Sequence, residues 1–185
     1  MNFCQQSLAK SPKKQYTQKK RRRKNMAVLI RPATNTDIPD IHRMLTSIAA
    51  FHAEARPDIF RSGTSKYTEQ EIADLLADDT CRIFVAEEDG VFGYVFCILQ
   101  TVQDHLLLQD KRELYVDDLF VDADRRGSGT ATLLMEEAQR EAKRQNCDCI
   151  TLNVWNVPHS ALPFYEKLGY TERKRYMEMP IENAK

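Results

Sequence analysis

The sequence predicts one α/β (α+β) domain, in which helices flank a mixed sheet. Two observations predict the fold class: some segments space their apolar residues as an amphipathic helix does, and others are short apolar, strand-like runs. Along the chain these segments follow the order β-α-α-β-β-β-α-β-α-β. The length of 185 residues suits a single domain with one sizeable core.

The first half of this order ends near residue 100. A strand is predicted over 27–33, and a helix with apolar residues at helical spacing is predicted over 36–55, with Thr36 as its cap. A capping-box pattern precedes a short helix over 69–78. Residues 81–100 are two apolar runs joined at an Asp-Gly pair, which is typical of a β-hairpin.

The second half repeats both kinds of segment. A strand is predicted over 113–122, a helix over 129–146 and a further strand over 149–155. A short helix over 160–169 ends on a glycine, the residue that commonly stops helices in the left-handed conformation. The segment 170–181 is predicted as a closing strand.

Composition excludes several classes of protein. Hydrophobic residues make up 42% and charged residues 29%, as in ordinary soluble domains. Neither a run of 18 apolar residues nor a secretory signal is present in the sequence, so we expect no membrane association and a cytoplasmic location. The five cysteines are expected to be reduced, and Cys147 and Cys149 lack the spacing of a zinc site, so no metal is expected.

The net charge of zero hides an asymmetry along the chain. Residues 1–26 hold nine Lys and Arg and no acidic residue, which leaves 18 basic and 27 acidic side chains, a net charge of −9, in the rest of the chain. The sequence therefore predicts a basic, disordered tail over 1–26 and a folded domain over 27–183. The tail is interpreted as a solvated arm or an extension upstream of Met26, in preference to a nucleic-acid arm.

The stretch "RRGSGTATLLM" (125–135) places two glycines directly before a helix. Glycines permit a sharp turn, and the unpaired N–H groups and partial positive charge at a helix N-terminus favour an anion. A pyrophosphate would fit this combination, with charge-assisted contacts from Arg125 and Arg126. The alternative is a glycine-rich turn that binds nothing.

Two motifs together resemble the GNAT acyltransferase superfamily, and more narrowly its small single-domain members of bacterial type. "RGSGTA" (126–131) is similar to its R/Q-x-x-G-x-G/A signature, and "ALPFYEKLGY" (161–170) is similar to its last helix, with the tyrosine in register. The predicted order of elements is also that of the family. The resemblance covers residues 28–181 and implies acetyl-CoA as co-substrate.

The resemblance also implies where acetyl-CoA binds. The pantetheine arm would pair with the backbone of Leu119, Phe120 and Val121, and the turn would hold the pyrophosphate through Arg125, Arg126, Gly127, Ser128, Gly129, Thr130 and Ala131. Many members carry an asparagine that contacts the cofactor seven residues before the tyrosine. Here that position is Pro158, and Asn156 or Ser160 is the expected substitute.

Acyl transfer to an amine needs a base for the ammonium proton and a donor for the leaving thiolate. The resemblance assigns the donor role to Tyr165. A packed core aromatic is the alternative, although Phe164 and Leu168 can supply the core contacts of this helix. Asp117 and Asp118 interrupt an apolar strand, and alternation predicts that they lie on opposite faces of the sheet. Asp117 matches the acidic position of polyamine-acetylating relatives, with Asp118 as the second candidate.

The sequence thus favours an acetyl-CoA-dependent N-acetyltransferase in which a primary amine attacks directly in a ternary complex. Charge favours a small cationic acceptor, such as a polyamine or aminoglycoside, or a protein amine. The residues expected to line its site are His52, Glu54, Arg56 and Asp58, although Arg56 and Asp58 could instead pair with each other. A non-catalytic CoA-binding module and a nucleic-acid-associated protein are the alternatives, and a homodimer is left open.

Overall fold

A single mixed sheet forms the centre of the computed structural model, which describes residues 27–158 and 160–181. Its strands follow one another in space as they do in sequence, and neighbours are antiparallel except for the last pair. They are β1 (Leu29–Pro32), β2 (Cys81–Glu87), β3 (Val91–Val102), β4 (Lys111–Val121) and β5 (Cys149–Leu152). The predicted fold class is confirmed.

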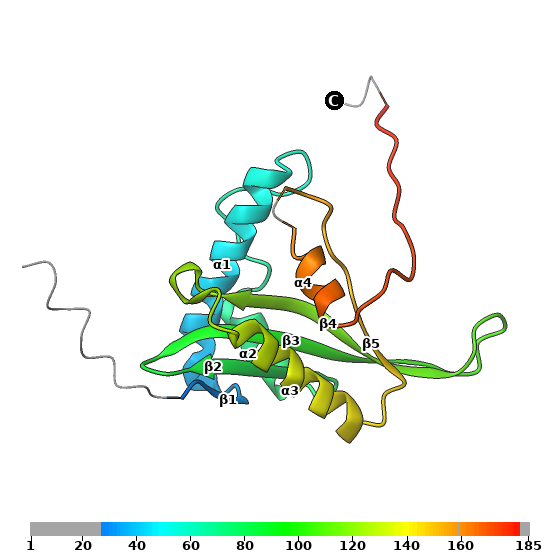
Figure 1. Cartoon of the computed structure of the whole chain (residues 1–185), viewed down its shortest axis with the longest axis horizontal. Helices are drawn as coiled ribbons and strands as arrows, with labels where there is room; N and C mark the ends of the chain where they lie inside the picture. The colour runs from blue at the N-terminus through cyan, green and yellow to red at the C-terminus, as the bar shows by residue number, and fades with distance from the viewer. Residues whose placement is uncertain (1–26, 159, 182–185) are drawn as a thin grey trace, which may run out of the picture.

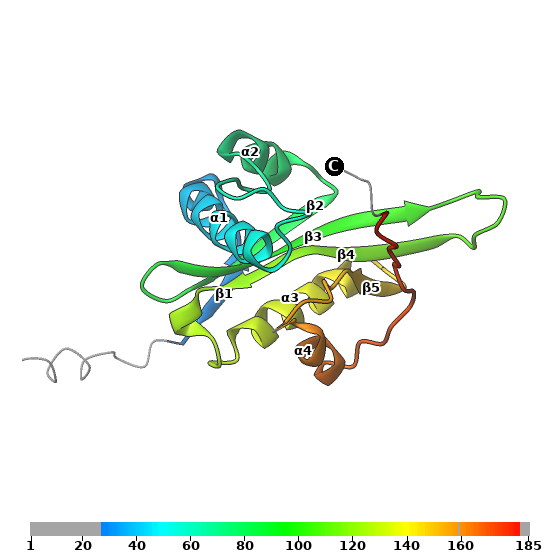
Figure 2. The ribbon, with the colours of Figure 1, turned by 90° about the horizontal axis from the view of Figure 1, so that it is seen from above.

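Helices cover both faces of the sheet (Figure 1). Figure 2 shows the first two helices on one face and the last two on the other. They are α1 (Ile38–Ala55) and α2 (Glu69–Ala77), then α3 (Thr130–Arg144) and α4 (Leu162–Lys167), with short 3-10 turns η1 (Asn35–Asp37) and η2 (Ala123–Arg125). This layering follows from amphipathic helices that must each bury one apolar stripe.

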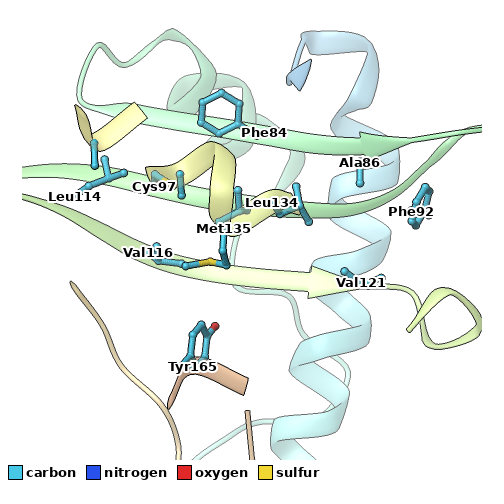
Figure 3. Close-up of a cluster of buried hydrophobic side chains, with 13 residues drawn as sticks. Phe84, Ala86, Phe92, Cys97, Leu114, Val116, Val121, Leu134, Met135 and Tyr165 are labelled. Carbon is cyan, nitrogen blue, oxygen red and sulfur yellow. The ribbon is translucent and has the colours of Figure 1, made fainter. Parts of the chain in front are cut away.

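The core is divided by the sheet into two clusters. On one face, α1 buries Ile41, Met44 and Leu45, which the helical period places on one side. On the other face, α3 buries Leu134 and Met135, which Figure 3 shows in front of the strands. Burial of this kind stabilises the folded state by about 25 cal/mol per Å² of apolar surface removed from water. This free energy holds both helices on the sheet.

The start of α1 differs from the prediction. Thr34, and not Thr36, forms the capping box, because the turn η1 precedes the helix. Asp37 closes this box by accepting from the backbone N–H of Thr34 at 2.8 Å. A hydrogen bond from Arg31 holds the pKa of Asp37 below its usual range, although burial opposes this effect.

The prediction of a closing strand over 170–181 is wrong for the part of the chain that the structure describes. Residues 171–181 are exposed and form no ladder with β5. Ion pairs hold the segment instead, from Arg173 to Glu113 and from Glu178 to Arg56, both at 2.7 Å. A strand is stabilised by paired backbone groups and a buried face, and the charged run 172–175 offers no apolar face to bury.

Two further expectations concern thiols and the tail. Among the described residues, Cys81, Cys97, Cys147 and Cys149 are free thiols. The predicted tail over 1–26 lies outside the described residues. No helix within the described ranges is long and apolar enough to cross a membrane.

Candidate active site

The centre of β4 contains an irregularity that alternation along a strand does not predict. Phe96 of β3 pairs with Asp118 and the next residue, Cys97, pairs with Val116. Asp117 is therefore an extra residue without a partner, which makes a β-bulge. The parallel ladder to β5 ends at the same place, with Leu152 opposite Val116. In the described chain, β4 continues from residue 117 to 121 paired with β3 alone.

The bulge places both carboxylates of β4 on the face covered by α1 and α2. The Tyr67 hydroxyl donates to Asp117 at 2.9 Å, and the Tyr94 hydroxyl donates to Asp118 at 3.3 Å. Both tyrosines pack in the cluster on this face. The prediction that Asp117 and Asp118 lie on opposite faces is wrong, because one extra residue reverses the alternation that follows it.

The two carboxylates have different surroundings. Asp117 forms an ion pair with Lys66, whose Nζ lies 2.8 Å from Oδ2 and 3.1 Å from the main-chain oxygen of the same residue. Burial raises the pKa of Asp118 to about 6, and the neighbouring charge of Asp117 adds to this effect. The site thus joins one carboxylate that is paired with Lys66 to one whose pKa is raised by burial.

Tyr165 approaches β4 from the opposite face. It is the buried residue of α4, whereas Phe164 and Leu168 are half-buried, so the expected division between core residues and a cleft-facing tyrosine is reversed. Figure 3 shows its hydroxyl end directed toward the part of β4 between Val116 and Val121. Burial, with a smaller effect from Asp118, raises the pKa of Tyr165 well above 10, so its hydroxyl keeps its proton at neutral pH.

The glycine turn after β4 has an open backbone. Gly127 and Gly129 have φ values of +75° and +86°, in the left-handed region that favours glycine. A Cβ at either position would meet open space, so the main chain here is accessible. Ser128 donates to the carbonyl oxygen of Arg125 at 2.7 Å and shares a hydrogen bond with Thr130 at 2.8 Å. The hydroxyls therefore fold back on the turn, and α3 begins immediately after it.

The two arginines of this turn differ. Arg125 pairs with Glu88 and lies 4.5 Å above the ring of Phe92, so its charge is already compensated. Arg126 is exposed and donates only from Nε, to the Val121 oxygen at 3.1 Å, among the contacts of the described residues. The structure therefore offers Arg126 to an anion at the turn more readily than Arg125.

Comparison with known proteins identifies the family. The family model described as Acetyltransferase (GNAT) family matches residues 47–170, which is more than half of the chain. The chain belongs to this GNAT family of acyltransferases. The matched range extends from α1 past Tyr165, and it includes the bulge and the glycine turn.

Individual relatives agree with this assignment. An uncharacterised N-acetyltransferase of Methanocaldococcus jannaschii is 31% identical over 102 residues, which cover 54% of this chain and 43% of that protein. The chain thus spans less than half the length of this curated relative. The structure of a tetramutant of the BH1408 protein of Bacillus halodurans is similar, with 28% identity, a TM-score of 0.79 and coverage of 83% of this chain and 99% of that chain.

An aminoglycoside acetyltransferase from an uncultured soil metagenomic sample shares 20% identity, with a TM-score of 0.63 and coverage of 85% of this chain and 100% of that chain. A likeness at this identity shows the GNAT fold alone.

The candidates for the missing GNAT asparagine lie in the segment between β5 and α4. Asn156 is exposed there, whereas Ser160 is partly buried and accepts a hydrogen bond at 3.2 Å from the backbone N–H of Leu162. Ser160 therefore already serves the first turn of α4. Asn156 remains the freer candidate for a contact with acetyl-CoA.

None of the predicted acceptor residues of this GNAT chain has a hydrogen bond or ion pair to Asp117 among the described residues. Arg56 pairs with Asp58 at 2.8 Å and with Glu178, which bears out the alternative that Arg56 and Asp58 pair with each other. Glu54 is exposed. His52 packs on Phe60 with ring centroids 5.0 Å apart, and burial, with a contribution from Lys66, lowers the pKa of His52.

Two residues of the site are absent from the sequence-based predictions, namely Lys66 and Tyr67. Both contact Asp117, although about 50 residues separate them from it along the chain. They lie in the connection between α1 and α2, where no spacing or motif marks them. Only the packing of this connection against the sheet reveals their contact with Asp117.

Proposed function

We propose that the chain is an acetyl-CoA-dependent N-acetyltransferase that moves an acetyl group to a primary amine by direct attack in a ternary complex. One observation carries the proposal: the bulge brings Asp117 and Asp118 to one face of β4 where the strand loses its β5 partner. An acyl donor and an amine could thus meet at one point, from the free edge and from the α1–α2 face.

The residues present fit acetyl-CoA. The β4 edge over 119–121 has no ladder on the β5 side in the described chain, so its main-chain groups can pair with an extended pantetheine arm. The open turn, the first N–H groups of α3 and the exposed Arg126 suit a pyrophosphate. When bound, acetyl-CoA supplies an activated acyl group as a thioester.

On the acceptor side, Asp117 would hold the ammonium group of the amine and receive its proton through water. Alkyl ammonium groups titrate near ~10, so the base must act before the nitrogen can attack. Asp118, with a pKa of about 6, is a second proton acceptor behind it. Two adjacent carboxylates favour a cationic acceptor such as a polyamine, an aminoglycoside or a protein amine.

On the donor side, Tyr165 would stabilise the leaving sulfur. A thiol titrates near ~8.5, whereas burial raises the pKa of Tyr165 above 10. Complete proton transfer from the phenol to the thiolate is therefore uphill. Hydrogen-bond donation to the thiolate, followed by protonation from solvent, is the role that this pKa supports.

The test is a screen of primary amines with acetyl-CoA, in which released thiol is detected, followed by a matched pair of variants. Tyr165→Phe should lower kcat by roughly 100-fold because it removes the donor. Tyr170→Phe is the control, since Tyr170 stacks edge-on to Tyr165 and its buried hydroxyl has no partner among the described residues. Equal kcat in both variants would contradict the role of Tyr165, and absence of thiol release with every amine would favour a non-catalytic module.

A further inference from the structure

The ammonium group of Lys66 already lies where the proposed function needs an acceptor amine. Its Nζ is 2.8 Å from Oδ2 of Asp117 and 3.1 Å from the main-chain oxygen of the same residue, at the bulge itself. It also lies 5.5 Å from the centre of the Tyr67 ring. A primary alkyl ammonium group from the chain itself thus contacts the carboxylate assigned to the acceptor.

Lys66 is held at this place without being buried. Its side chain is 38% exposed and belongs to the connection between α1 and α2. Lys111 gives a natural comparison, because it is 34% exposed and its Nζ lies 2.9 Å from Glu113 of the same strand. The two lysines differ in where their carboxylate partners lie. Glu113 lies where β4 pairs with β5, and Asp117 lies where that pairing has ended.

We propose that Lys66 is a substrate of its own active site and becomes acetylated on Nζ, within the same molecule, by an acyl-CoA thioester. This inference rests on the proposed function. Lys66 first passes one ammonium proton to Asp117, which releases it to solvent. The free amine nitrogen forms a bond to the thioester carbonyl carbon, the carbon–sulfur bond breaks, the nitrogen releases its second proton to solvent as the amide forms, and the departing thiolate takes up a proton. The products are an amide on Lys66 and free CoA, with no oxidant or reductant required.

Acetylation would also change the site. The amide nitrogen carries no positive charge, so the ion pair with Asp117 would be lost. The carboxylate would then be free to bind the ammonium group of an external amine.

The experiment follows acetylation of each lysine by peptide mass spectrometry after purified, unmodified protein is mixed with acetyl-CoA. Lys66 should react at least roughly 100-fold faster than Lys111, because its nitrogen is held at the reacting site. The rate per molecule should not change on dilution of the protein. Tyr165→Phe should slow the reaction at Lys66 and leave the slow background reaction at Lys111 unchanged, and Lys66→Arg should remove the fast phase.

Equal slow rates at Lys66 and Lys111 would overturn the inference, as would a rate at Lys66 that Tyr165→Phe does not change. A rate that rises with protein concentration would also overturn it, because the reaction would then occur between molecules. Calorimetric titration with acetyl-CoA and thiol release with small amines are measured on the same preparation. If both succeed while Lys66 stays unmodified, only this inference fails, whereas failure of both removes the proposed function as well.

Discussion

The two halves of β4 hold the same pair of groups in different surroundings. Glu113 and Asp117 have nearly equal side-chain exposure, 13% and 12%, and each pairs with a lysine, Lys111 at 2.9 Å and Lys66 at 2.8 Å. Glu113 lies between β3 and β5, whereas Asp117 is the bulged residue after which β5 is no longer paired. Both residues carry a carboxylate with a lysine partner and similar exposure, so the comparison points to the local pairing of the strand as what makes Asp117 a candidate for catalysis.

The largest effect, on acetyl-CoA binding, is expected at the glycine turn that follows residues 117–121, the half of β4 that does not pair with β5. Gly129→Glu should abolish acetyl-CoA binding, because it adds a negative charge and a side chain where the main chain faces open space. The measurement is calorimetric titration with acetyl-CoA.

Gly63→Glu is the matched control for backbone strain. Gly63 also has a positive φ, +70°, and open space at its Cβ, but it lies in the connection between α1 and α2. Both variants should lose about 1–2 kcal/mol of stability from the left-handed backbone. Unchanged affinity in Gly129→Glu would remove the turn from the binding site.

A smaller but still large effect is expected at the bulge itself. Asp117→Asn should lower kcat/KM for a cationic amine by roughly 100-fold, because the amide can neither pair with an ammonium group nor accept its proton. The variant keeps the size of the side chain and an oxygen that can accept from Tyr67. Steady-state kinetics at low amine concentration give the value, and an unaltered kcat/KM would move the base to Asp118.

Asp118 should be visible in the pH dependence of stability. Its pKa in the folded protein is about 6, above the ordinary value of 3.8, so folding favours the protonated form. Stability is therefore lost as pH rises from about 4 through about 6. Asp118→Asn should remove this loss and stabilise the protein at pH 7 relative to the parent by about 2–3 kcal/mol.

Urea unfolding of the parent and of Asp118→Asn between pH 4 and pH 7 tests this expectation. Other carboxylates with shifted pKa values are common to both proteins, so the difference between the two curves isolates Asp118. Parallel curves across this range would show that the carboxylate is not desolvated in the folded protein.

The smallest effect, on stability, is expected at Glu113, in the half of β4 that pairs with β5. Hydrogen bonds from Lys111 and Arg173 lower the pKa of Glu113, although burial acts against them. Glu113→Gln should cost less than about 1 kcal/mol at neutral pH, as ion pairs near the surface usually do. Its contribution is present above the ordinary carboxyl pKa and is lost as pH falls through the lowered value.

The kinetics of Glu113→Gln give a second comparison between Glu113 and Asp117. Glu113→Gln should leave kcat/KM for amines unchanged, because this carboxylate contacts Lys111 and Arg173 and lies where β5 closes the sheet. A fall in kcat/KM as large as that of Asp117→Asn would show that the end of the β5 pairing does not define the site.

The sequence alone determined the features that depend on local spacing. The helical period identified α1 and α3, the capping box identified α2, and the Asp-Gly pair identified the hairpin of β2 and β3. Gly127 and Gly129 marked the turn before α3 because only glycine readily adopts positive φ. The motif around Tyr165 placed that residue on a short helix, as the structure shows.

Tertiary structure decided the features that depend on partners distant in the chain. The bulge at Asp117 exists only in the register between β3 and β4, and it overrode the alternation that predicted opposite faces. Lys66 and Tyr67 reached Asp117 only through the packing of the α1–α2 connection on the sheet. Residues 171–181 remained without a ladder because a strand needs a partner as well as a favourable composition, and a single sequence does not specify that partner.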